Sequence, residues 1–435
     1  MSSPSQLDLT SLDLTPEFSE AFRLMEKTTD CLFITGSAGT GKSTLLTYFR
    51  ENTVKNVVVL APTGIAALNV GGQTIHSFFK FPIGVITGQA IKKAEKPELY
   101  KAIDTLIIDE ISMVRADIID GIDHFMRTNG RDKKLPFGGA QVIMIGDVFQ
   151  LPPVVTSEEE QTLFGSYYET PYFFSAKVFD SLLLRKIRLN KIFRQRDPHF
   201  IEVLQAIRSN TATNETLQTI NQRFFPEFIP DAEDFYVWLT STNDLAAQIN
   251  TSRLLQLREN ESRFTAAIDG RFDKKFFPAE ETLVLKKNAQ VMFLKNDPSK
   301  RWVNGTIGKV KEVLSESVKV EIETDGIRKI VTAERVEWEI LKYDFNSKTK
   351  QISSQSAGKF IQFPLRLAWA VTIHKSQGKT FDRVVIDMGR GAFAHGQLYV
   401  ALSRCRTLNG IMLRSKVRPR DIIVDERIVR FVNEL

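Results

Sequence analysis

The chain of 435 residues is 43% hydrophobic and 25% charged, with a formal net charge of +6 and a pI near 9.1. At roughly 150 residues per domain this length favours two to four globular domains. No apolar run reaches the ~18 residues that span a membrane. Residues 1–20 contain no Lys or Arg, so we expect neither a secretory nor a transit signal there, and the two distant cysteines predict no disulfide framework. We expect a cytoplasmic protein, and its basic excess permits nucleic-acid binding without establishing it.

The first motif along the chain is a phosphate-binding loop. Residues 36–43 fit the pattern G-x-x-x-x-G-K-[ST] without mismatch, between an apolar run at 31–34 and a helix-like segment at 44–49. Backbone N–H groups of such a loop and the following helix N-terminus attract phosphate. We expect Lys42 to contact the β- and γ-phosphates and Ser43 to hold Mg²⁺. The predicted nucleotide-binding residues are Gly36, Ser37, Ala38, Gly39, Thr40, Gly41, Lys42, Ser43 and Thr44.

Short apolar runs that alternate with helix-like segments dominate the rest of the chain. After the run at 31–34, they occur at 57–60, 106–108, 142–145, 237–239 and 384–386. This order predicts an α/β fold with parallel sheets, which bind ligands at the carboxyl ends of their strands. Residues 282–344 instead alternate apolar and polar, with a hairpin signal at Asp325-Gly326. They predict an inserted antiparallel barrel, and residues 64–101 predict a second insertion.

Acidic and amide side chains follow two of the predicted strands. Asp109 and Glu110 come after the run at 106–108, where we expect Asp109 to hold Mg²⁺ and Glu110 to polarise the attacking water. Gln150 follows the run at 142–145, and its amide is suited to sense a γ-phosphate. A strand-ending turn explains the neighbouring prolines but not Asp147 or Gln150.

Two arginines are candidates for stabilising charge on the transferred phosphate. Arg194 and Arg404 each follow an apolar stretch. A cation that meets the γ-phosphate when two domains close couples hydrolysis to domain motion. On the sequence alone, a solvent-facing helix arginine explains either residue equally well.

Two further segments are candidates for nucleic-acid contact. Residues 370–380 are rich in hydroxyl groups and glycine, and include Thr372, His374, Lys375 and Ser376, which suit backbone phosphates. Within the second insertion, His76, Phe78 and Phe79 offer polar donors and faces on which bases stack. The alternative for the paired phenylalanines is a place in the core.

In order along the chain, seven motifs resemble those of superfamily-one DNA helicases: GSAGTGKST, APTGIAA, DEISM, GDVFQLPPV, KIFRQ, WAVTIHKSQGKTFD and GQLYVALSRC. Within that superfamily the chain is most similar to the PIF (petite integration frequency) helicases, relatives of RecD. Residues 117–127, with Phe137-Gly138-Gly139, resemble that family's own element. The resemblance covers the chain from about Gly36 to Arg406.

The resemblance implies two RecA-like domains with ATP and Mg²⁺ between them and single-stranded DNA across their tops. It places domain 1A at 1–63 and 102–180, a wedge 1B at 64–101, domain 2A at 181–281 and 345–435, and a Src-homology-three-like barrel 2B at 282–344. It assigns catalytic roles to Lys42, Asp109, Glu110, Gln150, Arg194 and Arg404. It implies DNA contacts by Thr63, Thr242, Asn243, Asn304, Gly305, Thr306, His374 and Ser376.

The implied activity is ATP-dependent, 5′-to-3′ unwinding of DNA by a monomer. Its implied substrates are single-stranded DNA, forked or tailed duplexes, G-quadruplexes and RNA–DNA hybrids. The implied location is the bacterial nucleoid, or the nucleus or mitochondrion in a eukaryote. The rival functions are a translocating ATPase without strand separation and a non-catalytic nucleotide-binding module; the latter needs neither the carboxylate pair nor the arginines.

One departure from the family pattern concerns recognition of adenine. The family has a Gln upstream of the phosphate loop, and Phe18 stands at that position here. The resemblance therefore leaves two alternatives open, stacking of the base on Phe18 or recognition by Gln6.

Overall fold

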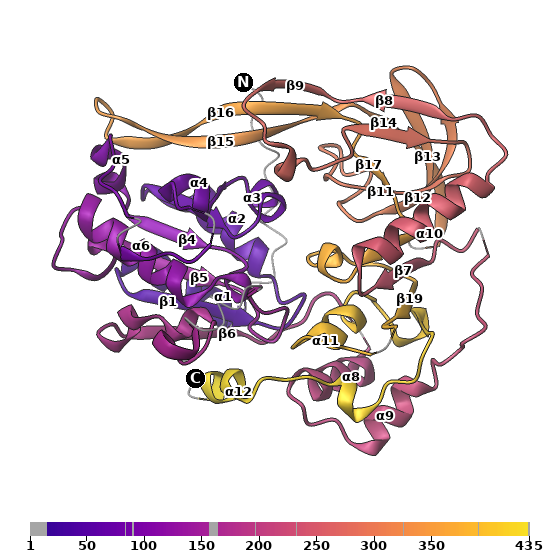
Figure 1. Ribbon diagram of the computed structural model, residues 1–435, viewed down its shortest axis with the longest axis horizontal. Helices are drawn as coiled ribbons and strands as arrows, with labels where there is room; N and C mark the ends of the chain where they lie inside the picture. Colours follow the sequence, from indigo (N-terminus) through magenta and orange to yellow (C-terminus); the bar gives the residue numbers. More distant parts are fainter. Residues whose placement is uncertain are drawn as a thin grey trace.

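The computed structural model describes residues 15–82, 84–88, 91–155, 164–195, 197–231, 233–324, 326–389 and 391–433. Its first domain is built on a parallel sheet with strand order β3-β2-β4-β5-β1-β6 (Figure 1). The strands are β1 (Cys31–Gly36), β2 (Val57–Ala61), β3 (Gln73–Thr74), β4 (Thr105–Ile108), β5 (Gln141–Ile145) and β6 (Leu184–Leu189). The central strands β1, β4 and β5 are buried on both faces, which explains their continuous apolar runs.

Helices cover both faces of this first sheet. On one face, α1 (Pro16–Lys27) and α2 (Lys42–Asn52) pack on alternate strand residues such as Leu32 and Ile34. The other face carries α4 (Ile75–Phe79), α5 (Pro97–Ala102) and α6 (Ala116–Asn129), which pack on residues such as Phe33. The short helix α3 (Gly64–Asn69) follows β2.

The second domain contains a smaller parallel sheet with strand order β18-β7-β19-β20. The strands are β7 (Val237–Thr240), β18 (Ala370–Thr372), β19 (Val384–Asp387) and β20 (Ile411–Leu413). Its helices are α8 (Pro198–Arg208), α9 (Asn214–Asn221), α10 (Asn243–Gln256) and α11 (Gln397–Leu402). The two parallel sheets confirm the predicted α/β fold.

An antiparallel sheet with its own apolar core projects from the second domain. Its order is β14-β13-β12-β11-β17, and β8 (Ser262–Thr265) pairs with β10 (Thr282–Leu285) beside it. The strands of the larger sheet are β11 (Gln290–Phe293), β12 (Ile307–Val313), β13 (Ser317–Thr324), β14 (Ile327–Glu334) and β17 (Leu365–Leu367). Thr324 pairs with Ile327, as the predicted hairpin requires, although Asp325 lies outside the described residues.

The end of the antiparallel region differs from the predicted boundary at residue 344. A long hairpin of β15 (Val336–Asn346) and β16 (Gln351–Gln362), paired with β9 (Ala267–Gly270), crosses that boundary. We call residues 336–362 the arm. It runs from the second domain along the first, with its tip near α5 (Figure 1). Residues 353–356 are exposed throughout, so they lack the apolar alternation that signals a strand.

The arm docks on the edge of β2 that faces away from β4, before the point where β3 begins to pair with it. The Tyr343 hydroxyl accepts a hydrogen bond from the Val59 N–H at 3.0 Å and donates to the Val59 carbonyl at 3.3 Å. Asn56 donates to the Lys350 carbonyl and accepts from the Ile352 N–H. Because β3 pairs only with Leu60 and Ala61, the arm supplies hydrogen-bond partners that β2 otherwise lacks at this edge.

The predicted insertion at 64–101 lies partly within the first domain. Strand β3 pairs with β2, and α4 directs Phe78 and Phe79 into the core, where they are 5% and 2% exposed. The two rings lie 4.9 Å apart, and Phe79 lies 5.1 Å from Phe125. The prediction that these phenylalanines stack on bases is therefore wrong: the amphipathic helix buries them, as the alternative stated.

We expect Phe79→Ala to reduce the stability of the first domain by about 3–5 kcal/mol, because it leaves a cavity among packed rings. Chemical unfolding monitored by fluorescence measures this loss. The control is Ser77→Ala, an exposed position on the same helix. Equal midpoints for the two variants would contradict the core assignment.

The C-terminal helix α12 (Glu426–Asn433) returns to the first domain (Figure 1). Phe431 stacks on Phe174 with ring centres 4.3 Å apart, and its carbonyl accepts a hydrogen bond from Lys186. The arm and α12 thus connect the two domains at separate places. In the described part of the chain, no helix has both the length and the apolar character needed to cross a membrane.

Candidate nucleotide site between the two domains

The glycine loop lies between the end of β1 and the start of α2. Gly39 and Gly41 have φ of +86° and +87°, a left-handed conformation that favours glycine. A Cβ at Gly39 would lie 2.4 Å from the Cβ of Arg194, so a side chain there is also excluded by space. The Phe193 N–H donates to the Gly39 carbonyl at 2.9 Å. The connection to the second domain therefore packs directly on the loop.

Lys42 is held by carbonyl groups of its own loop. Its Nζ donates to the carbonyls of Gly36 at 2.8 Å and Ser37 at 3.0 Å. Burial lowers the pKa of Lys42, while the carboxylates of Asp147 and Glu110 oppose that change. A cation stabilised by neutral acceptors at the mouth of an anion-binding loop is suited to receive a phosphate.

The carboxylate pair follows β4 directly. The Asp109 N–H donates to the Leu60 carbonyl, and Glu110 has φ +51° and ψ +45°. This left-handed backbone costs a non-glycine residue on the order of 1–3 kcal/mol, and such strain is enriched at functional sites. Burial raises the pKa of both carboxyls, and the charge of Glu110 raises that of Asp109 further.

Ser43 and Asp109 line the same cavity and provide two oxygen donors. Within the described ranges, no cluster of three or more Asp, Glu, His or Cys side chains forms a metal site. Mg²⁺ bound beside a nucleotide takes one or two protein oxygens and completes its coordination with phosphate and water. The residues present therefore fit Mg²⁺ carried by a nucleotide.

Gln150 lies in the turn after β5. It is 7% exposed, and its Nε2 donates to Asp147 Oδ2 at 3.5 Å. It nevertheless lines the cavity. This contact orients the amide beside the phosphate loop.

The two candidate arginines come from beyond the first sheet. Arg404 is 1% exposed; its Nε donates to the Val400 carbonyl at 2.9 Å, and an Nη donates to Ser403 Oγ at 2.8 Å. Arg194 donates to the Ser403 carbonyl at 3.4 Å. Burial lowers the pKa of Arg404 to about 9, and the charge of Arg194 contributes. Across the residues described, neither arginine forms an ion pair with a carboxylate, so both retain capacity for an anion.

A single cavity of about 1050 Å³ brings these groups together. It opens between the two domains and reaches residues 300–307, in the connection from β11 to β12 and at the start of β12. All six residues with predicted catalytic roles line it: Lys42, Asp109, Glu110, Gln150, Arg194 and Arg404. Of the predicted nucleotide-binding residues, Ala38 to Thr44 and Phe18 line it, whereas Gly36 and Ser37 lie behind the loop and hold Lys42.

Phe18 lies on the first turn of α1, where Thr15 caps the helix by accepting from the Phe18 N–H. Its ring packs edge-on against Tyr48 with ring centres 5.7 Å apart. The position lines the cavity beside the loop, which keeps the stacking hypothesis open. Gln6, the alternative, lies outside the described residues.

The predicted DNA contacts divide into exposed and buried positions. Thr63 and Thr242 cap α3 and α10, and both are exposed together with Asn243, His374 and Lys375. His76 is half-buried, and burial lowers its pKa.

Thr372 and Ser376 lie within the turn rather than on its surface. Ser376 is fully buried and donates to the Ile373 carbonyl at 2.7 Å; Thr372 is 4% exposed and accepts from the Lys375 N–H. In this structure their hydroxyls are not available to DNA, which corrects the prediction for these two residues. Their hydrogen bonds instead hold the turn together, and His374 and Lys375 are exposed on it.

Residues 304–306 join β11 to β12 and line the far end of the cavity. Asn304 accepts from Lys379 Nζ at 3.1 Å and donates to Asn69 of the first domain at 3.4 Å. A Cβ on Gly305, which has φ +99°, would lie 3.3 Å from the Cβ of Lys379. The predicted contact segment thus meets both domains.

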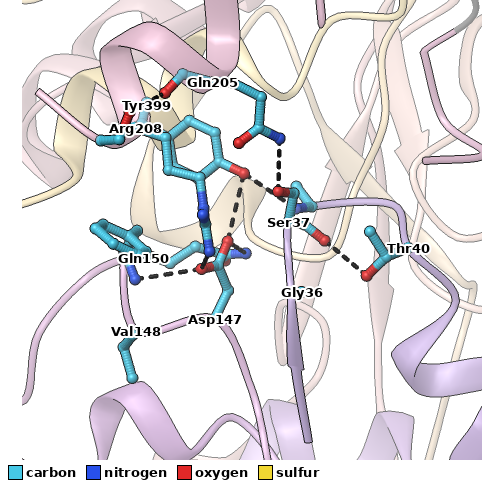
Figure 2. A network of polar contacts seen from close by, with 12 residues as sticks. Gly36, Ser37, Thr40, Asp147, Val148, Gln150, Gln205, Arg208 and Tyr399 are labelled. Carbon is cyan, nitrogen blue, oxygen red and sulfur yellow. Dashed lines mark hydrogen bonds and ion pairs between the residues drawn. The ribbon is translucent and has the colours of Figure 1, made fainter. Parts of the chain in front are cut away.

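Three polar residues of the second domain contact the first domain at this site and were not predicted from the sequence (Figure 2). Gln205 donates to Ser37 Oγ at 2.8 Å, Arg208 pairs with Asp147 at 2.8 Å, and Tyr399 accepts from the Ala38 N–H at 3.0 Å. Tyr399 stands inside one of the seven motifs, which was the available signal. Gln205 and Arg208 lie on an ordinary amphipathic helix, with no signal in the sequence.

The chain is similar to known helicases over nearly its whole length. A family model described as PIF1-like helicase matches residues 14–218, and one described as UvrD-like helicase C-terminal domain matches residues 367–411. The ATP-dependent DNA helicase Pif1 of Bdellovibrio bacteriovorus is 33% identical over 437 residues, covering 97% of this chain and 92% of that protein.

Two solved structures of Bacteroides Pif1 are also similar. The complex with ADP-AlF4 has 37% identity and a TM-score of 0.89, and the complex with ssDNA has 38% identity and a TM-score of 0.69. Each match covers 98% of this chain and 97% of the other. Given this similarity over nearly its whole length, the chain belongs to the PIF1-like helicase family.

Proposed function

We propose that this protein is an ATP-dependent DNA helicase that moves 5′ to 3′ along single-stranded DNA and separates duplex DNA ahead of it. The observation that carries the proposal is the single cavity lined by the phosphate loop, the carboxylate pair and arginines from beyond the first sheet. A nucleotide-binding module needs only the loop. Because hydrolysis uses groups from both domains, each cycle of binding and release changes their relative position.

In the proposed reaction, Lys42 and the loop N–H groups hold the β- and γ-phosphates. Ser43 and Asp109 would hold Mg²⁺, which neutralises charge on the phosphates when bound. Glu110 accepts a proton from the attacking water, and Gln150 orients that water. Arg194 and Arg404 stabilise the charge that develops on the transferred group.

The rival proposal is a translocating ATPase that separates no strands. ATP hydrolysis stimulated by single-stranded DNA, measured together with strand displacement on a 5′-tailed duplex, distinguishes the two. A helicase displaces the strand under the conditions that stimulate hydrolysis. Stimulated hydrolysis without displacement would support the rival, and no hydrolysis would refute both.

We also propose G-quadruplexes and RNA–DNA hybrids as substrates. The family resemblance supports this part of the proposal. The exposed candidate contacts are also consistent with it, because they suit backbone phosphates, which these substrates share, rather than base edges. The same displacement assay tests it, with the duplex replaced by a folded quadruplex or a hybrid behind an identical 5′ tail.

Binding to single-stranded DNA should depend strongly on salt and weakly on sequence. We expect affinity to fall about tenfold or more between 50 and 200 mM salt, because phosphate contacts release counterions. Lys375→Ala should reduce the magnitude of the slope of log affinity against log salt concentration by somewhat less than one, because one phosphate contact is lost. Lys348→Ala, an exposed lysine at the arm tip, is the control and should leave the slope unchanged. Fluorescence anisotropy measures both, and an affinity unchanged by salt would contradict the assignment.

A further inference from the structure

A buried ion pair joins the two domains behind the phosphate loop. Asp147 follows β5 of the first domain, and Arg208 ends α8 of the second. Their oxygen and nitrogen lie 2.8 Å apart, and the two side chains are 0% and 2% exposed. Arg208 also lies over the ring of Phe149 at 4.1 Å. Although burial opposes its charge, Arg208 lowers the pKa of Asp147, so the carboxyl stays ionised.

Such a pair is a poor way to gain stability, because removing two charges from water costs about as much as their attraction returns. Arg208 even leaves its buried Nε without a partner in the described structure. In some proteins a buried ion pair instead fixes how two parts of the chain meet. Here the pair joins Asp147 of the first domain to Arg208 of the second.

Tyr399 extends the ion pair to the phosphate loop (Figure 2). Its hydroxyl donates to Asp147 Oδ2 at 3.3 Å and accepts from the Ala38 N–H at 3.0 Å. Burial raises the pKa of Tyr399 to about 12, and the charge of Asp147 acts in the same direction. The phenol therefore keeps its proton and both hydrogen bonds. Gln205, one turn before Arg208 on α8, makes a parallel contact with Ser37.

Tyr399 and Arg404 belong to one rigid unit. Tyr399 lies on α11, and Arg404 follows the helix and bonds back to its Val400 carbonyl at 2.9 Å. Any shift of α11 relative to the phosphate loop therefore carries the Arg404 guanidinium with it. The Tyr399 hydroxyl is a direct hydrogen-bonded link between that helix and the loop.

We propose that Tyr399 is a positioning residue, which with Asp147 and Arg208 aligns α11, and so Arg404, with the phosphate loop. The inference rests on the proposed function, since Arg404 acts there on the transferred phosphate. Tyr399 itself touches neither nucleotide nor DNA in this role. It sets the distance at which the arginine of the second domain meets a nucleotide held by the first.

The test is Tyr399→Phe, which removes one hydroxyl and keeps the ring. We expect the kcat for ATP hydrolysis to fall about 10- to 100-fold while KM changes less than about threefold, because alignment matters most in the transition state. Tyr343→Phe is the matched control: that phenol also bonds two backbone groups in a buried place, but on the arm. Its kcat should equal that of the parent.

A double-mutant cycle separates positioning from general stability. If Tyr399 acts through Arg404, Tyr399→Phe should cost little further rate in an Arg404→Ala background. Asp147→Asn should reproduce the kcat loss of Tyr399→Phe, and it replaces that variant if the latter does not fold. A parent-like kcat in the folded variant, or a full additional loss in the Arg404→Ala background, would overturn the inference. Failure of the parent to hydrolyse ATP would instead refute the proposed function.

Discussion

Replacement of Lys42 by Ala is expected to reduce ATP hydrolysis to background. Lys42 is the cation that the loop carbonyls hold at the mouth of the cavity, and no other lysine of the described phosphate loop replaces it. Binding of single-stranded DNA should survive, because the exposed candidate contacts, among them Thr242 and Lys375, lie on other loops. A steady-state phosphate-release assay and an anisotropy titration measure the two results.

Lys27→Ala, an exposed lysine of the same domain, is the control and should hydrolyse ATP like the parent. Appreciable hydrolysis by a pure preparation of Lys42→Ala would contradict the assignment of this loop to ATP hydrolysis. Loss of DNA binding together with hydrolysis would show that the two surfaces are not separate.

The second large effect is expected for the arginines. Arg404→Ala and Arg194→Ala should each lower turnover by on the order of 10³–10⁵, the range for arginine fingers, and leave ATP binding largely intact. Both guanidinium groups line the cavity without a carboxylate ion pair in the described structure, so their charge is available to a phosphate. Single-turnover hydrolysis, with the enzyme in saturating excess over ATP, measures the loss.

A transition-state analogue sharpens this prediction. The parent should bind ADP with aluminium fluoride more tightly than ADP alone, and each arginine variant should lose much of that preference. Arg258→Ala, exposed in the second domain, is the control. Turnover within a few-fold of the parent in both arginine variants would make them ordinary structural arginines.

The sequence predicted those parts of the site whose evidence is local. The loop at 36–43 and the pair Asp109-Glu110 each follow an apolar run, and a parallel sheet brings the ends of such runs to one edge. Arg194 and Arg404 required the family resemblance as well, because an arginine after an apolar stretch has no specific meaning by itself. The structure places all of them around one cavity.

What the sequence did not predict depends on contacts between distant residues. Asp147 meets Arg208 across 61 positions and Tyr399 across 252, and no periodicity marks such pairs. The arm was missed because residues 353–356 are polar and exposed throughout, although backbone pairing makes them a strand. Ser376 was predicted wrongly for a different reason. A hydroxyl in a polar turn suggested a phosphate contact, but in the structure it donates a hydrogen bond to the Ile373 carbonyl within the same turn.

The polarity of strand displacement tests most directly whether this protein moves along one strand in one direction. The substrates are one duplex with a 5′ single-stranded tail, the same duplex with a 3′ tail, and a blunt form, each with ATP and a fluorescent reporter of separation. We expect ATP-dependent displacement from the 5′-tailed duplex and little displacement from the other two. Equal displacement from both tails, a preference for the 3′ tail, or displacement that persists in Lys42→Ala would contradict it.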